Sequence, residues 1–326
     1  MVGETARFVA RFAEAMTIYV DSYLDDAERR RCIYAGDIFV YSPRPSTLAL
    51  TGFARELIEA AFAPLAPQHA QKSVPVERFV EIVAPLKPRF IHHPKTLQLL
   101  LALLGDFGVD LDKTYFDVPR MRVATSDGYL NAGVAYPLHP HRDIWYSSPP
   151  CQLNWWFPVY PFEAESTFAF HQRYWTEPVP NSSNEYNHYE WNKVGRAQSA
   201  AQVKVDTRKQ PKATVPLELE PDVRVVCPPG GLILFSGAHL HSTVANTSGR
   251  SRFSIDFRTA HHDELATFGG APAIDRHCTG TTLFELRRVR DLAPVPDEII
   301  RLYDPNLPAD REGLVFKPPA EVTSSM

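Results

Sequence analysis

The sequence predicts a mainly β protein with flanking helices, an α+β arrangement. From about residue 113 the chain consists of short apolar or alternating runs separated by Pro, Gly, Ser and Asp, which is typical of an all-β sandwich or barrel. Before that point, apolar side chains recur at helical spacing. Strands and helices do not alternate regularly, which argues against a doubly wound α/β fold.

The N-terminal part, residues 1–112, is predicted to be largely helical and to pack on the core. One helix face is indicated by apolar residues three or four positions apart: Phe8, Phe12, Met16 and Tyr19. A second helix is expected over TGFARELIEAAFAPL, capped by Thr51, and a third over HPKTLQLLLALLGDFG, where His93 precedes a proline. Between the first two, GDIFVYS is expected to form a short strand.

Residues 113–260 are predicted to form the β core. The candidate strands are TYFDVPRMRVAT, AGVAYPL, CQLNWWFPVY, STFAFH, VRVVCPP, GLILFSG and SRFSIDFRTA. An insertion at about 171–216 interrupts them, and so long a connection is usually a lid or binding loop, the alternative being a surface excursion. The C-terminal extension, 261–326, carries one predicted helix at DEIIRLY. We expect these parts to form one compact unit.

The composition excludes several classes of protein. With 44% hydrophobic residues, 22% charged residues and a net charge of −4, the chain is typical of a soluble globular protein rather than a disordered, collagen-like or membrane protein. The 34 basic and 38 acidic residues give no electrostatic footprint for nucleic acid. Four scattered cysteines and no signal-peptide pattern predict free thiols in the cytoplasm. No membrane partner is expected, and the oligomeric state is left open.

Two histidine-containing stretches carry the candidate chemistry. In LHPHRD, His141 and Asp143 are two residues apart, so on a strand they would point to the same side. In the second stretch, His239 and His241 follow the candidate strand GLILFSG. Two histidines and one carboxylate on one face suit Fe(II) and leave positions open for a cosubstrate and oxygen. Because H-x-D alone is common by chance, the metal-site prediction depends largely on the second stretch.

Together these stretches resemble the motifs of the phytanoyl-CoA dioxygenase family of Fe(II)/2-oxoglutarate-dependent oxygenases. That family shows H-x-D, then a strand of the type PG-x-[ILV]-x-[ILV]-F, then a His followed by Asn five residues on and Arg eleven residues on. In PGGLILFSGAHLHSTVANTSGRSR, Asn246 and Arg252 stand at those distances from His241. The resemblance covers roughly residues 115–260 and implies a double-stranded β-helix (jelly-roll) core.

The resemblance also implies a role for each matching residue. His141, Asp143 and His241 would bind Fe(II). Arg252 would pair with the distal carboxylate of 2-oxoglutarate, because a guanidinium forms a bidentate, charge-assisted pair with a carboxylate. The hydroxyl of Thr243 would contact the same carboxylate.

The register of the second motif has an alternative. His239 and Arg250 are also eleven residues apart. We favour His241 with Arg252, because Asn246 then matches the turn of the family and because Arg252 lies within the apolar run RFSIDFR.

The implied activity is that of a small-molecule dioxygenase using Fe(II), 2-oxoglutarate and O2. Such an enzyme would hydroxylate, desaturate or cyclise a small polar metabolite or natural-product intermediate, and would release succinate and CO2. Related halogenases replace the metal-binding carboxylate with a small residue, so the presence of Asp143 favours hydroxylation or a related oxidation over halogenation.

Four further residues are candidates for substrate binding. Arg122 lies on the expected first core strand, and Trp145 follows the H-x-D motif directly. Asn154 and Trp156 share one face of CQLNWWFPVY, although the pattern does not tell which face lines a cavity.

Two other functions fit parts of the pattern. A cupin-type metalloenzyme that does not use 2-oxoglutarate would account for the H-x-H pairs, but no Glu follows the first pair. A non-catalytic jelly-roll module could use its Trp and Tyr residues to stack on a ligand, but this reading does not explain the His, Asp and Arg set.

Overall fold

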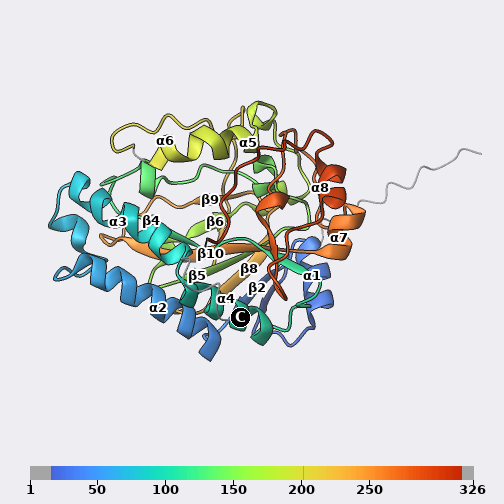
Figure 1. Cartoon of the computed structure of the whole chain (residues 1–326). Coiled ribbons are helices and arrows are strands. Elements are labelled where there is room, and N and C mark those ends of the chain that lie inside the picture. Colours follow the sequence, from blue (N-terminus) through green and yellow to red (C-terminus); the bar gives the residue numbers. More distant parts are fainter. Residues whose placement is uncertain (1–15, 201, 318–326) are drawn as a thin grey trace, which may run out of the picture.

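The computed structural model describes residues 16–200 and 202–317, which fold around two β-sheets (Figure 1). The larger sheet has eight strands in the order β1-β2-β8-β5-β10-β3-β11, and β4 also pairs with β10. The smaller sheet has the order β7-β6-β9. Apart from β1 and β2, which are parallel, the paired strands are antiparallel. The strands are β1 Ile18–Val20, β2 Ile38–Tyr41, β3 Thr114–Phe116, β4 Arg120–Ala124, β5 Leu153–Pro158, β6 Phe168–Phe170, β7 Val223–Arg224, β8 Leu232–Ser236, β9 His241–Thr243, β10 Arg252–His261 and β11 Arg287–Arg288.

Helices flank these sheets. The described helices are α1 Asp26–Tyr34, α2 Pro45–Phe62, α3 Val76–Ile91, α4 Pro94–Asp106, α5 His188–Glu190, α6 Arg196–Ala200, α7 His262–Thr267 and α8 Asp297–Tyr303. In Figure 1, α2 lies at the bottom of the view and α5 and α6 at the top, with the strands between them. None of the described helices is long and apolar enough to cross a membrane.

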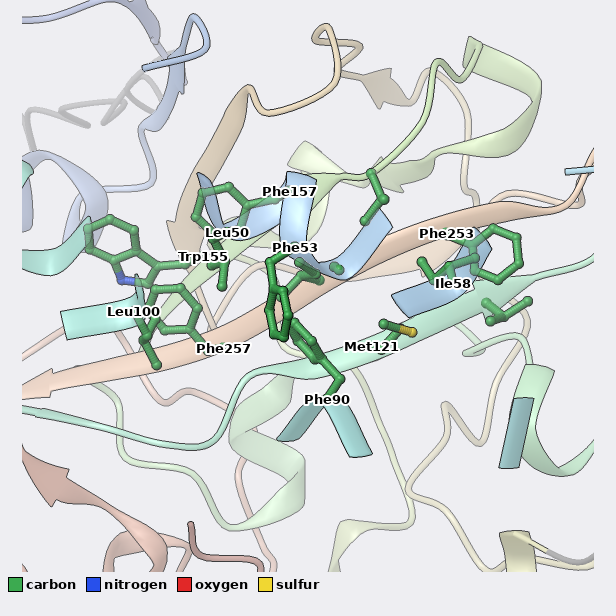
Figure 2. Packing of buried hydrophobic residues seen from close by; sticks show 14 of the residues in the cluster. Leu50, Phe53, Ile58, Phe90, Leu100, Met121, Trp155, Phe157, Phe253 and Phe257 are labelled. Carbon is green, nitrogen blue, oxygen red and sulfur yellow. The ribbon is translucent and has the colours of Figure 1, made fainter. Parts of the chain in front are cut away.

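The main core lies between the large sheet and helices α2, α3 and α4. Figure 2 shows Phe53 of α2 and Phe90 of α3 packed near Trp155 of β5 and Phe257 of β10. Because side chains alternate along a strand, these core residues leave the opposite face of β5 and β10 for other contacts. Burial of this aromatic core thereby determines which side chains face the smaller sheet.

The two sheets contact each other on that opposite face. Trp156 of β5 packs edge-on against Phe168 of β6, with ring centroids 5.2 Å apart. The ring centroid of Phe235 of β8 lies 5.5 Å from that of Phe168, in the same cluster. The metal-ligand candidates and the cavity described below lie at this junction.

Several predicted elements are confirmed. The strand at 36–42 is β2, and the C-terminal helix at DEIIRLY is α8. The third predicted helix is α4, and His93 caps it by accepting a hydrogen bond from the Lys95 N–H at 3.1 Å. Six of the seven candidate strands contain strand residues.

Other elements differ from the prediction. Tyr19 lies in strand β1 rather than in a helix, whereas Phe8 and Phe12 lie outside the described residues. Helix α2 begins at Pro45, so Thr51 is internal and its hydroxyl donates to the Thr47 carbonyl at 2.8 Å instead of capping the helix. The run AGVAYPL forms a short 3₁₀ turn rather than a strand.

The balance of helix and strand is also a correction. Helices α2, α3 and α4 have 18, 16 and 13 residues, so the fold is mixed α/β rather than mainly β. Helix α3 is missing from the prediction because Pro85 and Pro88 lie within it, and proline normally ends a helical pattern. Helix α1 is missing because it is short and strongly charged.

Candidate functional site

A cavity of about 420 Å³ opens between the two sheets. Its volume lies within the roughly 300–1,000 Å³ that is usual for small-molecule sites. Strands β4, β5, β9 and β10 contribute to its wall, together with the long insertion and the C-terminal extension. All three metal-ligand candidates line this cavity.

The backbone brings these three candidates together. His141 and His241 form an isolated antiparallel bridge in which each N–H donates to the other carbonyl, at 3.0 and 2.9 Å. The Asp143 N–H donates to the Gly237 carbonyl at 2.8 Å. A Cβ at Gly237 would lie only 3.2 Å from the Asp143 Cβ and 3.1 Å from Gln152 Nε2, so any other residue would press on these two side chains.

One ligand atom from each of His141, Asp143 and His241 lies within 4.8 Å of the other two. Nδ1 of His141 lies 2.7 Å from the His139 carbonyl, and Nδ1 of His241 lies 2.9 Å from the His239 carbonyl. A carbonyl only accepts, so each Nδ1 carries the proton and each Nε2 keeps a free lone pair. The two Nε2 atoms lie 3.4 and 4.0 Å from Asp143 Oδ1. Such backbone hydrogen bonds are the usual support of metal-binding histidines.

The protonation states suit a divalent metal. Burial, together with the nearby charge of His141, lowers the pKa of His241 to about 4, so its imidazole is neutral at neutral pH. Burial opposes ionisation of Asp143, yet the pKa of this carboxyl is held below its ordinary value by the neighbouring basic groups: His141 and His241 when they carry a proton on Nε2, and the Arg258 guanidinium. Imidazole nitrogens and a carboxylate oxygen on one side form the donor set of a non-haem iron site with open positions.

Two amides hold the carboxylate in place. Asp143 Oδ2 accepts hydrogen bonds from Asn154 Nδ2 at 2.6 Å and from Gln152 Nε2 at 3.0 Å. These bonds leave Oδ1 facing the two histidines. Asn154, predicted to bind substrate, thus contacts the metal-ligand candidate Asp143, although it also lines the cavity.

We expect Asn154→Ala to lower Fe(II) affinity by about 10- to 100-fold, the usual cost of losing a hydrogen bond to a metal ligand. The measurement is an anaerobic Fe(II) titration in competition with a coloured chelator. Asn131→Ala is the matched control, because Asn131 is exposed and does not line the cavity. If Asn154→Ala bound Fe(II) as tightly as the parent, the amide would not position the carboxylate.

Arg252 is a buried cation in the same cavity. It is only 8% exposed, its Nη1 donates to the Ser166 carbonyl at 3.0 Å, and its guanidinium lies 5.5 Å from the Trp156 ring centroid. Its buried Nε has no hydrogen-bond partner, and no carboxylate of the described residues lies within 4.0 Å of the guanidinium. A buried charge without a counter-ion is costly, so this arrangement suits an anionic ligand. Burial lowers the pKa of Arg252 to about 10, which leaves it charged.

Of the remaining candidates, Thr243, Arg122 and Trp156 line the cavity, whereas Trp145 does not. Thr243 lines the cavity from β9, and its hydroxyl accepts a hydrogen bond from the Leu138 N–H at 3.1 Å. Trp156 and Arg122 also line the cavity, and Arg122 forms a bidentate pair with Asp256 at 2.6 and 3.2 Å.

The prediction for Trp145 is wrong. This residue is fully buried, its indole N–H donates to Asp275 at 2.8 Å, and neither residue lines the cavity. The cavity is lined instead by Tyr146, whose ring lies 5.3 Å from the His141 ring. Asp143–Tyr146 forms a 3₁₀ turn, and in a turn neighbouring side chains point in different directions, whatever their distance from a motif in sequence.

Sequence reasoning missed most of the charged lining. Asp256 and Arg258 of β10 face the cavity, and their alternation with the core residues Ile255 and Phe257 could have indicated this. Glu285 had no such signal, because it lies in the C-terminal extension. Glu285 is buried there, and its Oε1 lies 3.3 Å from Nη2 of Arg196 in the insertion.

The insertion forms one wall of the cavity. Tyr186, His188, Trp191, Arg196 and Arg208 of the insertion all line it. His188 is buried beside Glu285, with His188 Nε2 3.4 Å from the carboxylate.

No protein-family model and no curated protein matches the chain. Solved structures resemble it at low identity. SnoN, a non-heme alpha-ketoglutarate-dependent epimerase from nogalamycin biosynthesis, is 15% identical, with 82% of this chain and 95% of that chain covered and a TM-score of 0.33. EvdO2 from Micromonospora carbonacea var. aurantiaca is 13% identical over 74% and 94%, with a TM-score of 0.41. The non-heme monooxygenase ThoJ is 14% identical over 66% and 69%, with a TM-score of 0.34. Identities of 13–15% and TM-scores of 0.33–0.41 do not establish a function for this chain.

Proposed function

We propose that the chain is a non-haem Fe(II)/2-oxoglutarate-dependent dioxygenase, similar to the phytanoyl-CoA dioxygenase family and built on a double-stranded β-helix core. The observation that carries this proposal is one cavity holding both the His141, Asp143 and His241 set and the buried, unpaired Nε of Arg252. The first set suits a metal. The second suits a carboxylate, and a cosubstrate that chelates iron and ends in a carboxylate needs both.

Each residue of the site has a defined task in this proposal. The imidazoles of His141 and His241 and the carboxylate of Asp143 bind Fe(II), while the backbone carbonyls behind the histidines fix their orientation. Arg252 binds the distal carboxylate of 2-oxoglutarate, assisted by the Thr243 hydroxyl. With O2, the bound iron and cosubstrate would supply an oxidant that removes hydrogen from the substrate, and succinate and CO2 would be released. Aromatic side chains around the cavity, among them Tyr146 and Phe168, exclude water from the reacting groups.

The finer assignments belong to the same proposal. The reaction is a hydroxylation, or a related desaturation or cyclisation, of a small molecule, with neither nucleic acid nor a membrane as partner. Residues 113–260 form the catalytic core, and the described parts of the N-terminal region (16–112), of the insertion and of the C-terminal extension (261–317) pack on it as one unit. A cytoplasmic location is supported by the four cysteines, which are free in the structure.

The test is an anaerobic titration of the protein with Fe(II) and 2-oxoglutarate. We expect a weak visible charge-transfer band that requires both components, and succinate release once oxygen and a substrate are admitted. Metal binding without the band would contradict the use of 2-oxoglutarate and favour a cupin-type metalloenzyme. Absence of metal binding would overturn the proposal and leave a non-catalytic jelly-roll module.

A further inference from the structure

A second cation of the cavity has no carboxylate partner. Lys87 of α3 lines the cavity, and its Nζ donates to the Val134 carbonyl. Among the described residues, no carboxylate oxygen lies within 4.0 Å of this Nζ. Lys87 therefore resembles Arg252 in being a cavity-lining charge without a counter-ion in the protein.

The charges of the lining do not balance. Seven Lys or Arg side chains line the cavity against four Asp or Glu side chains, although the whole chain carries a net charge of −4. Asp143 belongs to the metal-ligand set. The other three acidic side chains form ion pairs with arginines: Asp117–Arg120, Asp256–Arg122, Asp256–Arg258 and Glu285–Arg196. Lys87 and Arg252 are therefore left without a carboxylate, whereas Arg208 pairs with Asp206, which lies outside the lining.

Lys87 and Arg252 donate to carbonyls of different segments. Arg252 is held by the Ser166 carbonyl, next to the smaller sheet. Lys87 is held by the Val134 carbonyl, and Arg208 donates to the adjacent Gly133 carbonyl at 2.9 Å. The Arg208 guanidinium also lies 4.2 Å from the ring centroid of Tyr136, which places a flat aromatic surface beside these cations.

We propose that Lys87 binds an anionic group of the substrate, so that the substrate is an organic acid with an apolar body. This inference rests on the proposed function and names its substrate class. The apolar body would contact the uncharged lining, which includes Tyr136, Leu138 and Met121. An ammonium in a partly desolvated cavity forms a strong charge-assisted pair with a carboxylate or phosphate.

The proposal has a pH signature. Burial, then the charges of Arg122 and Arg208, lower the pKa of Lys87 to about 7, and only Asp256 opposes them. Because the ammonium is the form that binds an anion, affinity should be constant below pH 7 and fall about tenfold per pH unit above it. A neutral analogue should show no such dependence.

The experiment uses calorimetric titration of the anaerobic protein loaded with Fe(II) and 2-oxoglutarate. The probes are 3-phenylpropanoate, its uncharged match 3-phenylpropanamide, and phenyl phosphate. We expect at least one acid to bind tenfold or more tightly than the amide, and Lys87→Gln to remove that advantage while leaving amide binding unchanged. Lys87→Arg should keep the preference for an acid. Lys95→Gln is the matched control, because Lys95 lies half-exposed on α4 outside the cavity.

The outcomes separate this inference from the proposed function. Equal binding of acids and amide to the parent protein overturns the inference, as does a Lys87→Gln variant that folds with the parent's melting temperature and keeps the preference. Weaker 2-oxoglutarate binding in Lys87→Gln, with the acid preference intact, also overturns it by assigning Lys87 to the cosubstrate. A parent that binds neither Fe(II) nor 2-oxoglutarate refutes the proposed function, whereas the same probes on the metal-free protein still test Lys87. A stronger preference for phenyl phosphate supports the inference with a phosphorylated substrate.

Discussion

Replacing His241 by glutamine is expected to lower Fe(II) affinity by more than about 100-fold, beyond the cost of losing a supporting hydrogen bond. The substitution removes one of three donor atoms that lie within 4.8 Å of each other. Anaerobic Fe(II) titration against a chelator measures the loss. Asp143→Asn, which has nearly the same shape as the parent carboxylate, should cause a loss of similar size.

His239→Gln is the matched control for this prediction. His239 lies two residues before His241 and is also buried, but its ring lies tilted against Trp175, with centroids 4.5 Å apart, and its Nε2 has no partner. It supports the metal site only through its backbone carbonyl, which the substitution leaves in place. We therefore expect this variant to bind Fe(II) within about threefold of the parent. The reverse result, with His239 required and His241 dispensable, would show that the register of the motif is wrong.

Arg252→Gln is expected to weaken 2-oxoglutarate binding by about 30-fold or more while leaving Fe(II) affinity nearly unchanged. Removing one partner of a buried charged pair typically costs about 2–5 kcal/mol, and the guanidinium is buried with its Nε free for a ligand. The measurement is an anaerobic titration of 2-oxoglutarate into the Fe(II)-loaded protein. Arg252→Lys keeps the charge but loses the planar fork, so its affinity should fall between those of the parent and Arg252→Gln.

Arg250→Gln is the control for the alternative spacing. Arg250 stands eleven residues after His239, but it pairs with Glu163, whose side chain is exposed, and does not line the cavity. Its loss should leave 2-oxoglutarate affinity unchanged. A defect in Arg250→Gln with normal binding in Arg252→Gln would assign the carboxylate to the other register.

The positions of the metal-ligand candidates could be predicted because their signals are local. Residues two apart on an extended backbone share a side, which relates His141 to Asp143. The run from GLILFSG to RFSIDFR carries its own strand and turn pattern, and it delivers His241 and Arg252 to one cavity. Helix α4 could also be predicted from the sequence, because it has an unbroken apolar pattern and begins at a proline.

The mixed helix and strand content was harder to predict. Helix α3 carries two internal prolines and still packs Phe79 and Phe90 into the core. Here tertiary burial outweighs the local penalty of proline. Local rules therefore understated the helices that cover the large sheet.

The sequence by itself identified His141, Asp143, His241 and Arg252 as candidates, because each of the two motifs that contain them spans no more than about a dozen residues. Only the tertiary structure decided that Asn154 and Trp156, rather than Trp155 and Phe157, face the cavity. A strand's periodicity separates two faces but does not tell which one the helices bury. Lys87 and Glu285 reach the cavity from segments far from the metal motifs. Their placement results from packing between distant segments, which no spacing in the sequence encodes.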